Sequence, residues 1–329
     1  MRAFNYYKVA SVAQAVSLLS KHQLKAAVLA GGSDLLGMMK DGVEGPKFKI
    51  PGFLVDIKGI KELNYIKEEK TGLKIGAGTP LCDIVSSELV AKRYPLLRQA
   101  AGQVGVPQIR NVGTLGGNLC QRPRCWYFRG KLFQDCLRKG GNRCYALGGE
   151  NRYHAVFGGS KCYMVHPSDL APALMALNAR VEIASAKGTR TVPLENFYVS
   201  PEKNILGETV LSPQELVLAV EIPNPAATSK GVYLKLKERQ SFDFAIVSVA
   251  VSLSLKNNVV DQARIAFGGV APFPMRAVKA EAALKGKRIR DAIAVACKEA
   301  TNGAQPLGQN SYKVDAAKGI LEEALVHLA

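Results

Sequence analysis

The sequence lacks the features that would assign it to a membrane, to a secretory pathway or to a hydrolytic enzyme. No apolar run reaches the ~18 residues that span a bilayer, and residues 1–8 contain no apolar core of the signal-peptide type. No Ser-His-Asp arrangement, HExxH motif or matched pair of catalytic carboxylates is evident. We therefore expect a cytoplasmic protein without hydrolytic chemistry. It would reach the periplasm only if it were exported folded, with a partner that carries the signal.

Acidic residues are comparatively few. The chain has 44 Lys and Arg residues against 27 Asp and Glu residues, so its formal net charge at pH 7 is +17. Such a balance favours acidic partners or ligands. The basic residues are spread along the chain, form no block of about 5–8 residues and accompany no nucleic-acid-binding motif. The missing motifs disfavour nucleic acid, and an acidic protein partner or an anionic cofactor explains the charge equally well.

The chain also lacks the cysteine pattern of a small disulfide-rich domain or of a zinc knuckle. Its seven cysteines are an odd number in a long chain, so a disulfide framework is not expected. Cys82 and Cys297 lie in helix-like segments, where a cysteine is usually a small buried apolar residue, and Cys120 is ambiguous. The remaining four have the spacing C-x10-C-x7-C-x17-C and are the candidate metal ligands: Cys125, Cys136, Cys144 and Cys162.

Four thiolates suit Zn²⁺ or a [4Fe–4S] cluster. Zinc sites usually contain C-x2–4-C knuckles, which are absent here, and wide irregular spacing favours a larger object. Between Cys120 and Cys162 lie nine Arg and Lys residues but only two acidic ones, Asp135 and Glu150. An anionic cluster would be offset by these cations. The alternative is four incidental free thiols in a basic loop.

Two glycine turns precede helix-like segments. The first, Gly31-Gly32, follows an apolar strand-like run, and the second is Thr114-Leu115-Gly116-Gly117-Asn118. Neither matches GxGxxG or the P-loop pattern, but glycine lets backbone approach a ligand, and free N–H groups at a helix start favour an anion. Both turns could converge on one dinucleotide. Asp169, in the first turn of another helix, would either offset the helix dipole or bond a ribose or ring nitrogen.

The pattern of elements predicts an α+β protein of two or three subdomains. Residues 1–60 have the pattern of a small α/β unit, and residues 61–190 that of a second unit with an irregular insertion at 120–162. Beyond residue 190, four strand-like segments at 215–222, 231–238, 244–255 and 259–270 predict an antiparallel sheet. Three helices, at 276–284, 290–301 and 312–328, close the chain.

The chain resembles the FAD subunits of molybdenum hydroxylases. Four motifs occur in that family's order: Ala30-Gly31-Gly32-Ser33-Asp34, Thr114-Leu115-Gly116-Gly117-Asn118, Ser168-Asp169 and Tyr233-Leu234-Lys235. The resemblance implies a vanillyl-alcohol-oxidase-type (PCMH-type) FAD-binding domain at 1–190 and a CO dehydrogenase flavoprotein-like C-terminal domain at 191–329. The cysteine-containing insertion is similar to the [4Fe–4S] loop of the aldehyde oxidoreductase and 4-hydroxybenzoyl-CoA reductase members. The resemblance therefore implies two cofactors, FAD and a [4Fe–4S] cluster.

Carried over by position, the resemblance implies FAD contacts along both glycine turns and on three later segments. It also places Phe244 over the flavin ring, whereas Val104 leaves the other face without an aromatic counterpart. Cys120 matches no ligand of the [4Fe–4S] loop. The implied FAD-binding residues are Leu29, Ala30, Gly31, Gly32, Ser33, Asp34, Leu35, Leu36, Gly105, Thr114, Gly117, Asn118, Asp169, Val217 and Lys235.

The family's chemistry implies an electron-transfer subunit. Its partners would be a large subunit with the molybdenum cofactor and a small [2Fe–2S] subunit, in a heterotrimer or a dimer of heterotrimers. The extra cluster would be either a relay or a structural element, and NAD⁺, ferredoxin, quinone and oxygen are all open as electron acceptors. Two alternatives are a stand-alone FAD oxidoreductase and a metal-stabilised nucleic-acid-binding module.

Overall fold

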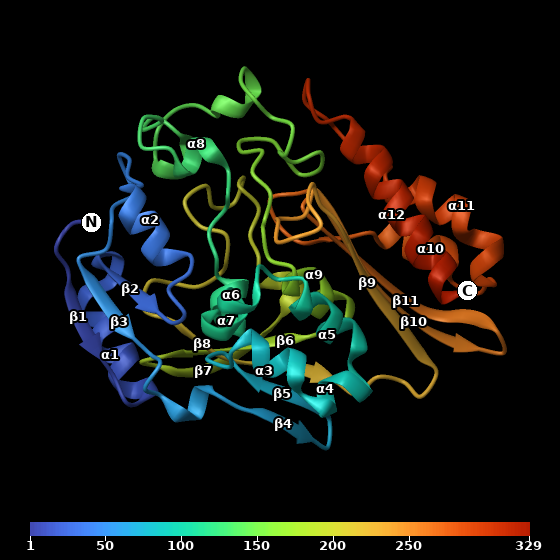
Figure 1. Cartoon of the computed structure of the whole chain (residues 1–329), viewed down its shortest axis with the longest axis horizontal. Helices are drawn as coiled ribbons and strands as arrows, with labels where there is room; N and C mark the ends of the chain where they lie inside the picture. The colour runs from blue at the N-terminus through green and yellow to red at the C-terminus, as the bar shows by residue number, and fades with distance from the viewer.

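The computed structural model describes all 329 residues and contains three sheets (Figure 1). The N-terminal lobe is a parallel three-stranded sheet in the order β1-β3-β2. Ser11 caps α1, whose buried face (Ala15, Val16 and Leu19) covers this sheet. The lobe confirms the α/β unit predicted for residues 1–60. Its elements are β1 (Asn5–Lys8), α1 (Val12–His22), β2 (Ala26–Leu29), α2 (Leu35–Asp41) and β3 (Phe53–Asp56).

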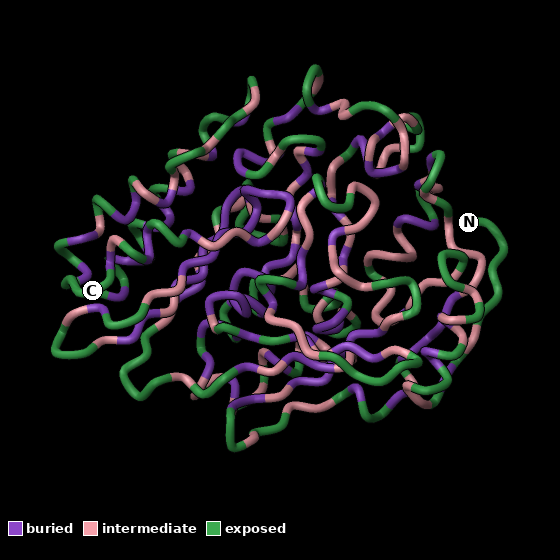
Figure 2. The backbone as a smooth tube through the Cα atoms, turned by 180° about the vertical axis from the view of Figure 1, so that it is seen from behind, coloured by how far each residue is buried: buried purple, intermediate pink, exposed green.

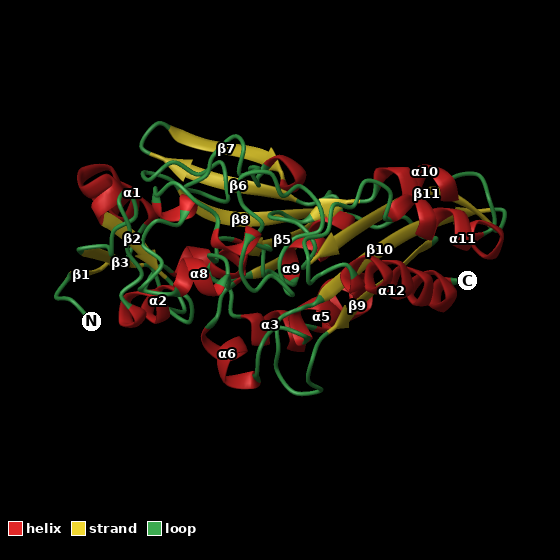
Figure 3. Ribbon diagram, turned by 90° about the horizontal axis from the view of Figure 1, so that it is seen from above, coloured by secondary structure: helices red, strands yellow, loops and turns green.

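The central sheet has five antiparallel strands in the order β4-β5-β8-β6-β7. These strands are β4 (Ile66–Glu69), β5 (Gly72–Gly76), β6 (Arg180–Ser185), β7 (Gly188–Pro193) and β8 (Leu216–Pro223). Short helices pack beside it: α3 (Leu81–Ser86), α4 (Glu88–Arg93), α5 (Pro95–Gly102), α6 (Pro107–Val112), α7 (Leu115–Leu119) and α9 (Leu170–Ala176). Figure 3 shows β7, β6, β8 and β5 side by side.

The C-terminal part is a four-stranded antiparallel sheet, β12-β11-β10-β9, with three helices on it. The strands are β9 (Ser229–Leu236), β10 (Val247–Lys256), β11 (Val259–Gly268) and β12 (Met275–Arg276). The helices are α10 (Val278–Leu284), α11 (Ile289–Ala300) and α12 (Tyr312–Leu328), in agreement with the sequence. The largest apolar core contains residues of both the central sheet and this sheet, so the two are packed as one body. Figure 2 shows buried segments through the middle of the molecule and exposed segments mostly at its edges.

One strand was assigned to the wrong sheet. The sequence predicted that residues 215–222 would join the C-terminal sheet, but β8 pairs with β5 and β6 instead. Apolar alternation identifies a strand without identifying its neighbours. The domain boundary near residue 190 stays a prediction. One strand of the central sheet, β8, lies on the C-terminal side of that boundary in the sequence. No pattern in the sequence indicated β1 or β7, and none of the residues in these two strands is buried.

Residues 120–162, the Cys-rich segment, contain little regular structure. They form α8 (Trp126–Arg129) and two 3-10 turns, η3 (Leu137–Lys139) and η4 (Tyr145–Leu147). The segment lies between the N-terminal lobe and the C-terminal helices (Figure 1). It is attached to both: Lys47 N donates to Lys139 O at 2.9 Å, and Asn151 exchanges hydrogen bonds with Gln309. The three other 3-10 turns are η1 (Gln23–Lys25), η2 (Lys61–Leu63) and η5 (Leu194–Asn196).

The longest helix, α12, has 17 residues, and none of the helices has the length and hydrophobicity that crossing a bilayer demands.

Candidate functional site

A cavity of about 760 Å³ opens between the N-terminal lobe, the central sheet and the Cys-rich segment. This volume falls within the range of cofactor and small-ligand sites. Its walls come from both glycine turns, from the start of β8, and from the loop that contains Phe242 and Phe244. Segments far apart in the sequence therefore enclose one space that is large enough for a dinucleotide.

The first glycine turn leaves β2 at the buried residue Leu29 and enters α2 at Leu35. Gly32 has φ +75°, a conformation that residues with side chains rarely adopt. A Cβ on Gly31 would lie 2.0 Å from the carbonyl oxygen of Val112, just before the second turn. The two turns are thus in direct backbone contact, as the sequence suggested they could be, and only glycine permits this approach.

The second turn begins at Thr114, whose side chain caps α7 by accepting a hydrogen bond from Gly117 N at 3.1 Å. Asn118 is held by Ser168, whose hydroxyl donates to the Asn118 Oδ1 at 2.5 Å. Gly105, also on the cavity wall, has φ +51°. The second turn therefore presents a capped helix start and an oriented amide to the cavity.

Asp169 is a buried carboxylate on the cavity wall. Lys235 Nζ donates to its Oδ2 and the Tyr233 hydroxyl donates to its Oδ1, both at 2.7 Å. Burial raises the pKa of Asp169 above its ordinary value, while Lys235 opposes that shift. These bonds give Asp169 specific side-chain partners in β9, which a role limited to offsetting the α9 dipole would not require.

Most of the predicted FAD residues line the cavity, and three do not. Leu29 and Leu36 pack with Met39 and Leu54 in a small apolar cluster beneath the turn, and Lys235 reaches the site only through Asp169. The predicted residues on the wall are Ala30, Gly31, Gly32, Ser33, Asp34, Leu35, Gly105, Thr114, Gly117, Asn118, Asp169 and Val217.

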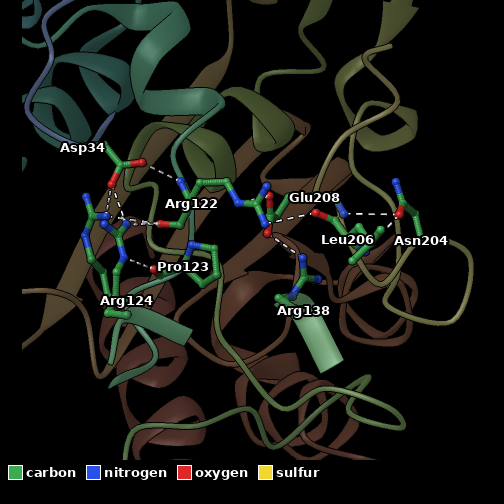
Figure 4. A network of polar contacts seen from close by, with 10 residues as sticks. Asp34, Arg122, Pro123, Arg124, Arg138, Asn204, Leu206 and Glu208 are labelled. Carbon is green, nitrogen blue, oxygen red and sulfur yellow. Dashed lines mark hydrogen bonds and ion pairs between the residues drawn. The ribbon is translucent and has the colours of Figure 1, made fainter. Parts of the chain in front are cut away.

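Asp34 connects the first turn to the Cys-rich segment. Its carboxylate accepts from Arg122 N at 2.8 Å and from the guanidinium groups of Arg124 and Arg129 (Figure 4). Burial opposes ionisation of Asp34, but the two guanidinium groups and the Arg122 N–H together hold its pKa below the ordinary value. A carboxylate beside a pyrophosphate site would repel the ligand unless it were neutralised in this way.

Sequence reasoning missed these arginines as cavity residues. Arg122, Arg124 and Arg129 all line the cavity, whereas the sequence assigned them only to charge compensation of a cluster. Cys120, which the sequence left out, lines it as well. A cation excess beside one acidic residue of the turn was the available signal, but the contact with Asp34 spans about ninety residues of sequence and is set by the fold.

Glu208 is a second buried carboxylate between arginines. Its Oε1 lies 2.5 Å from Arg138 and its Oε2 lies 3.0 Å from Arg122 (Figure 4). The Arg138 side chain is fully buried, and its Nε and Nη2 atoms have no hydrogen-bond partner. A buried guanidinium with unused N–H groups has unused capacity for an anion.

The four candidate cysteines are neighbours, but the structure contains no set of three or more His, Cys, Asp or Glu side chains arranged to hold a metal ion. Burial raises the pKa of Cys125 to about 12, with smaller contributions from the negative charges of Cys162 and Cys136. Burial likewise raises the pKa of Cys136 and of Cys162, and Cys144 adds to both shifts. Each of these three thiols thus has another candidate cysteine close enough to raise its pKa, and we call the four residues the cysteine ring.

Cys120 stands apart from this ring. Burial raises its pKa to about 12, and the only charged neighbour that contributes is Glu208. Two cations near the ring, Arg138 and Lys139, are fully buried. Lys139 Nζ donates to Gly130 O at 2.9 Å. Burial lowers the pKa of Lys139, and Cys136 and Cys125 oppose that shift.

Comparison with known proteins assigns both parts of the chain. Residues 2–225 match the family model described as the FAD binding domain in molybdopterin dehydrogenase, and residues 232–328 match that of the CO dehydrogenase flavoprotein C-terminal domain. The chain belongs to the FAD-binding subunits of the molybdenum hydroxylase family. It is thus a subunit of an oxidoreductase family, with the predicted FAD-binding and C-terminal folds.

Individual relatives cover nearly the whole chain. The aldehyde oxidoreductase FAD-binding subunit of Escherichia coli (strain K12) is 36% identical over 99% of this chain and 98% of its own length. The carbon monoxide dehydrogenase medium chain of Hydrogenophaga pseudoflava is 30% identical over 98% of this chain and 96% of its own. A solved carbon monoxide dehydrogenase structure from that organism superposes with a TM-score of 0.77, at 30% identity, over 99% of this chain and 96% of its own.

The cavity fits the FAD that this family binds. Its two touching glycine turns would admit a pyrophosphate close to backbone N–H groups. Its walls contain both apolar and polar residues, as a ligand with an apolar ring system and polar ribityl and phosphate groups requires. The comparisons do not assign a cofactor to the Cys-rich segment, since neither the family models nor the names of the relatives mention a cluster.

Proposed function

We propose that this chain is the FAD- and [4Fe–4S]-binding electron-transfer subunit of a multi-subunit molybdenum hydroxylase, of an aldehyde oxidoreductase or aromatic acyl-CoA reductase type. One observation carries the proposal: the two glycine turns meet at one cavity, and the Cys-rich segment is bonded directly to the first of them through Asp34. Both proposed cofactors would therefore lie in a single connected region.

The FAD site is assigned from the geometry of the cavity. The turn from Ala30 to Asp34 would hold the pyrophosphate, and Thr114, Gly117 and Asn118 would line the flavin side. Bound FAD would exchange electrons in steps of one or two. Asp169 would hydrogen-bond the cofactor, and Lys235 would keep that carboxylate ionised and oriented at 2.7 Å. Val217, on the cavity wall, would contact the flavin.

The ligands of the [4Fe–4S] cluster are assigned to Cys125, Cys136, Cys144 and Cys162. Such a cluster would supply a one-electron centre. The chain's own residues fit an anionic group at this place, since Arg138 is fully buried with unused Nε and Nη2 groups beside the ring of sulfurs. Its partner Glu208 is shared with Arg122, so one carboxylate faces two guanidinium groups, and an anion beside them would balance the remaining charge. We favour a relay role over a purely structural one, because the segment is bonded to the turn that lines the FAD cavity.

The partners follow from the family. The E. coli relative is named a subunit of an aldehyde oxidoreductase, and the Hydrogenophaga relative is named a medium chain. We propose a large molybdenum-cofactor subunit and a small [2Fe–2S] subunit, in a heterotrimer or a dimer of heterotrimers. The charge of +17 suits acidic partner surfaces. A cytoplasmic location, with co-export to the periplasm as the alternative, stays a prediction.

The test is to express the chain with the subunits encoded beside it and to purify the complex. The expected product contains FAD, four iron and four acid-labile sulfide per copy of this chain in addition to the partners' centres, and molybdenum. A complex that contains FAD but no additional iron would support the assignment as a flavin subunit and refute the [4Fe–4S] cluster. A flavoprotein that purifies alone and turns over a substrate would favour a stand-alone oxidoreductase instead.

A further inference from the structure

His154 lies against one of the proposed cluster ligands. Its Nε2 is 3.3 Å from the Cys125 sulfur. The ring is buried, with 4% of the residue exposed, and it packs edge-on to Trp126 at 5.8 Å between ring centroids and at a tilt to Tyr127 at 6.0 Å. Since both aromatic residues follow Cys125 directly, the imidazole and the thiol are fixed by the same small group of side chains.

The C-terminal helix holds His154 in this place. Lys313, in the first turn of α12, donates from Nζ to His154 O and to Tyr153 O, each at 3.1 Å, and to Gly269 O. Asn310 Nδ2 also donates to His154 O at 3.1 Å. Lys313 and Asn310 are fully buried. Two buried donor side chains in the C-terminal domain thus fix the backbone from which the imidazole projects, although no pattern in the sequence indicated a role for this histidine.

The position of the proton on the His154 ring follows from the partners of its two nitrogen atoms. A neutral imidazole has one N–H. The Nδ1 atom is buried without a partner. A thiolate or a cluster-bound sulfur cannot donate, so a hydrogen bond to it requires the proton on Nε2. That tautomer leaves an unpaired acceptor at Nδ1, which is more readily tolerated than an unpaired donor.

We propose that His154 is a positioning residue that donates its Nε2–H to the Cys125 sulfur and so raises the reduction potential of the cluster. This inference rests on the proposed function, since it presupposes the [4Fe–4S] cluster. Hydrogen bonds to ligand sulfurs are among the determinants of cluster potentials, and a donor stabilises the reduced, more negative state more than the oxidised one. Arg138 and Lys139 add fixed positive charge, whereas His154 adds a directional bond to one sulfur.

The test is an EPR-monitored redox titration of the purified complex. His154→Leu removes the N–H, whereas His154→Gln keeps an N–H donor close to the position of Nε2. The cluster midpoint potential is expected to fall in the Leu variant and to return towards the wild-type value in the Gln variant. The exposed His327→Gln, on α12, serves as the control and should leave the potential unchanged. An unchanged potential in His154→Leu overturns the role of His154.

A measurement on the wild-type complex does not depend on how the variants fold. With ¹⁵N-labelled histidine, pulsed EPR of the reduced cluster should detect weak coupling to one histidine nitrogen, and His154→Gln should abolish it. A cluster signal without that coupling overturns the hydrogen bond and leaves the proposed function intact. A wild-type complex without any cluster signal from this subunit overturns both.

Discussion

The two regions that meet at the cavity are built by different forces. The glycine turns are set by backbone geometry: Gly32 has φ +75°, and Gly31 is pressed against Val112 at a distance that excludes any side chain. The Cys-rich segment has almost no regular structure and is held by buried charges, with arginines paired to Asp34 and Glu208. The first region is stable through sterics and packing, whereas the second depends on neutralising its own cations.

The largest expected effect is on the proposed cluster. Cys136→Ser removes one thiolate from the ring and should abolish the iron–sulfur signal, while the flavin, held by the glycine turns, largely remains. Iron, acid-labile sulfide and FAD are measured on the same sample. Cys120→Ser is the matched control, because Cys120 is a half-buried cysteine outside the ring, and this variant should leave iron unchanged. Normal iron in Cys136→Ser would refute the ligand assignment.

A large effect on stability is expected at Glu208. Glu208→Gln leaves the fully buried Arg138 without its carboxylate partner, and breaking a buried ion pair in this way costs about 3–5 kcal/mol. The free energy of unfolding of the full chain is the measurement. Glu88→Gln removes an exposed helical pair with Lys92 and should cost at most about 0.5 kcal/mol. Equal effects in the two variants would contradict the view that buried charge holds the Cys-rich segment.

A smaller effect is expected from the first glycine turn. Gly32→Val forces a side chain into a left-handed conformation at a cost of about 1–2 kcal/mol. The free turn should relax to relieve this strain, and FAD binding, which needs the original conformation, should then weaken roughly ten-fold. FAD retained per chain after gel filtration is the measurement, and iron should not change. Gly102→Ala, in α5 with open space around its Cβ position and outside the cavity wall, is the control. Unchanged flavin in Gly32→Val would count against the pyrophosphate site.

The effect that is smallest at neutral pH, and grows only as the pH falls, is a pH dependence of stability. Burial, followed by the positive charges of Arg138 and Arg124, lowers the pKa of His166 to about 3 from the ordinary 6.5. Between pH 6.5 and about 3, His166 therefore binds a proton in the unfolded chain but not in the folded one. The stability contributed by His166 is present above pH 6.5 and is lost as the pH falls towards 3, at about 1.4 kcal/mol per pH unit. His166→Gln should flatten the pH dependence of unfolding between pH 6 and 4, whereas an unchanged slope would locate the acid sensitivity elsewhere.

The sequence predicted features that depend on neighbouring residues, and it did not predict those that depend on contacts between distant segments. The helix at 312–328 and the strands at 180–185 and 259–270 were predictable because their apolar periodicity depends only on neighbouring residues. The glycine turns were predictable because glycine is needed wherever backbone is crowded. The partners of β8 were not, since a strand's pattern records burial and does not record which strand lies beside it.

The candidate site divides in the same way. Residues such as Gly32, Thr114 and Asp169 could be identified from local motifs, and these motifs occur in the order seen in the family that the chain resembles. Arg124, Arg129 and His154 did not, because their roles depend on contacts with Asp34 and Cys125 that the folded chain creates.

The sequence by itself determined that this chain is an FAD subunit of the molybdenum hydroxylase family, with two glycine turns and a basic segment rich in cysteine. Those features are local, and they persist in the unfolded chain. Only the tertiary structure decided that the turns touch, that Asp34 and Glu208 neutralise buried arginines, and that an imidazole lies 3.3 Å from Cys125. Charges and donors acquire their partners through distances across the fold, and a linear sequence does not record those distances.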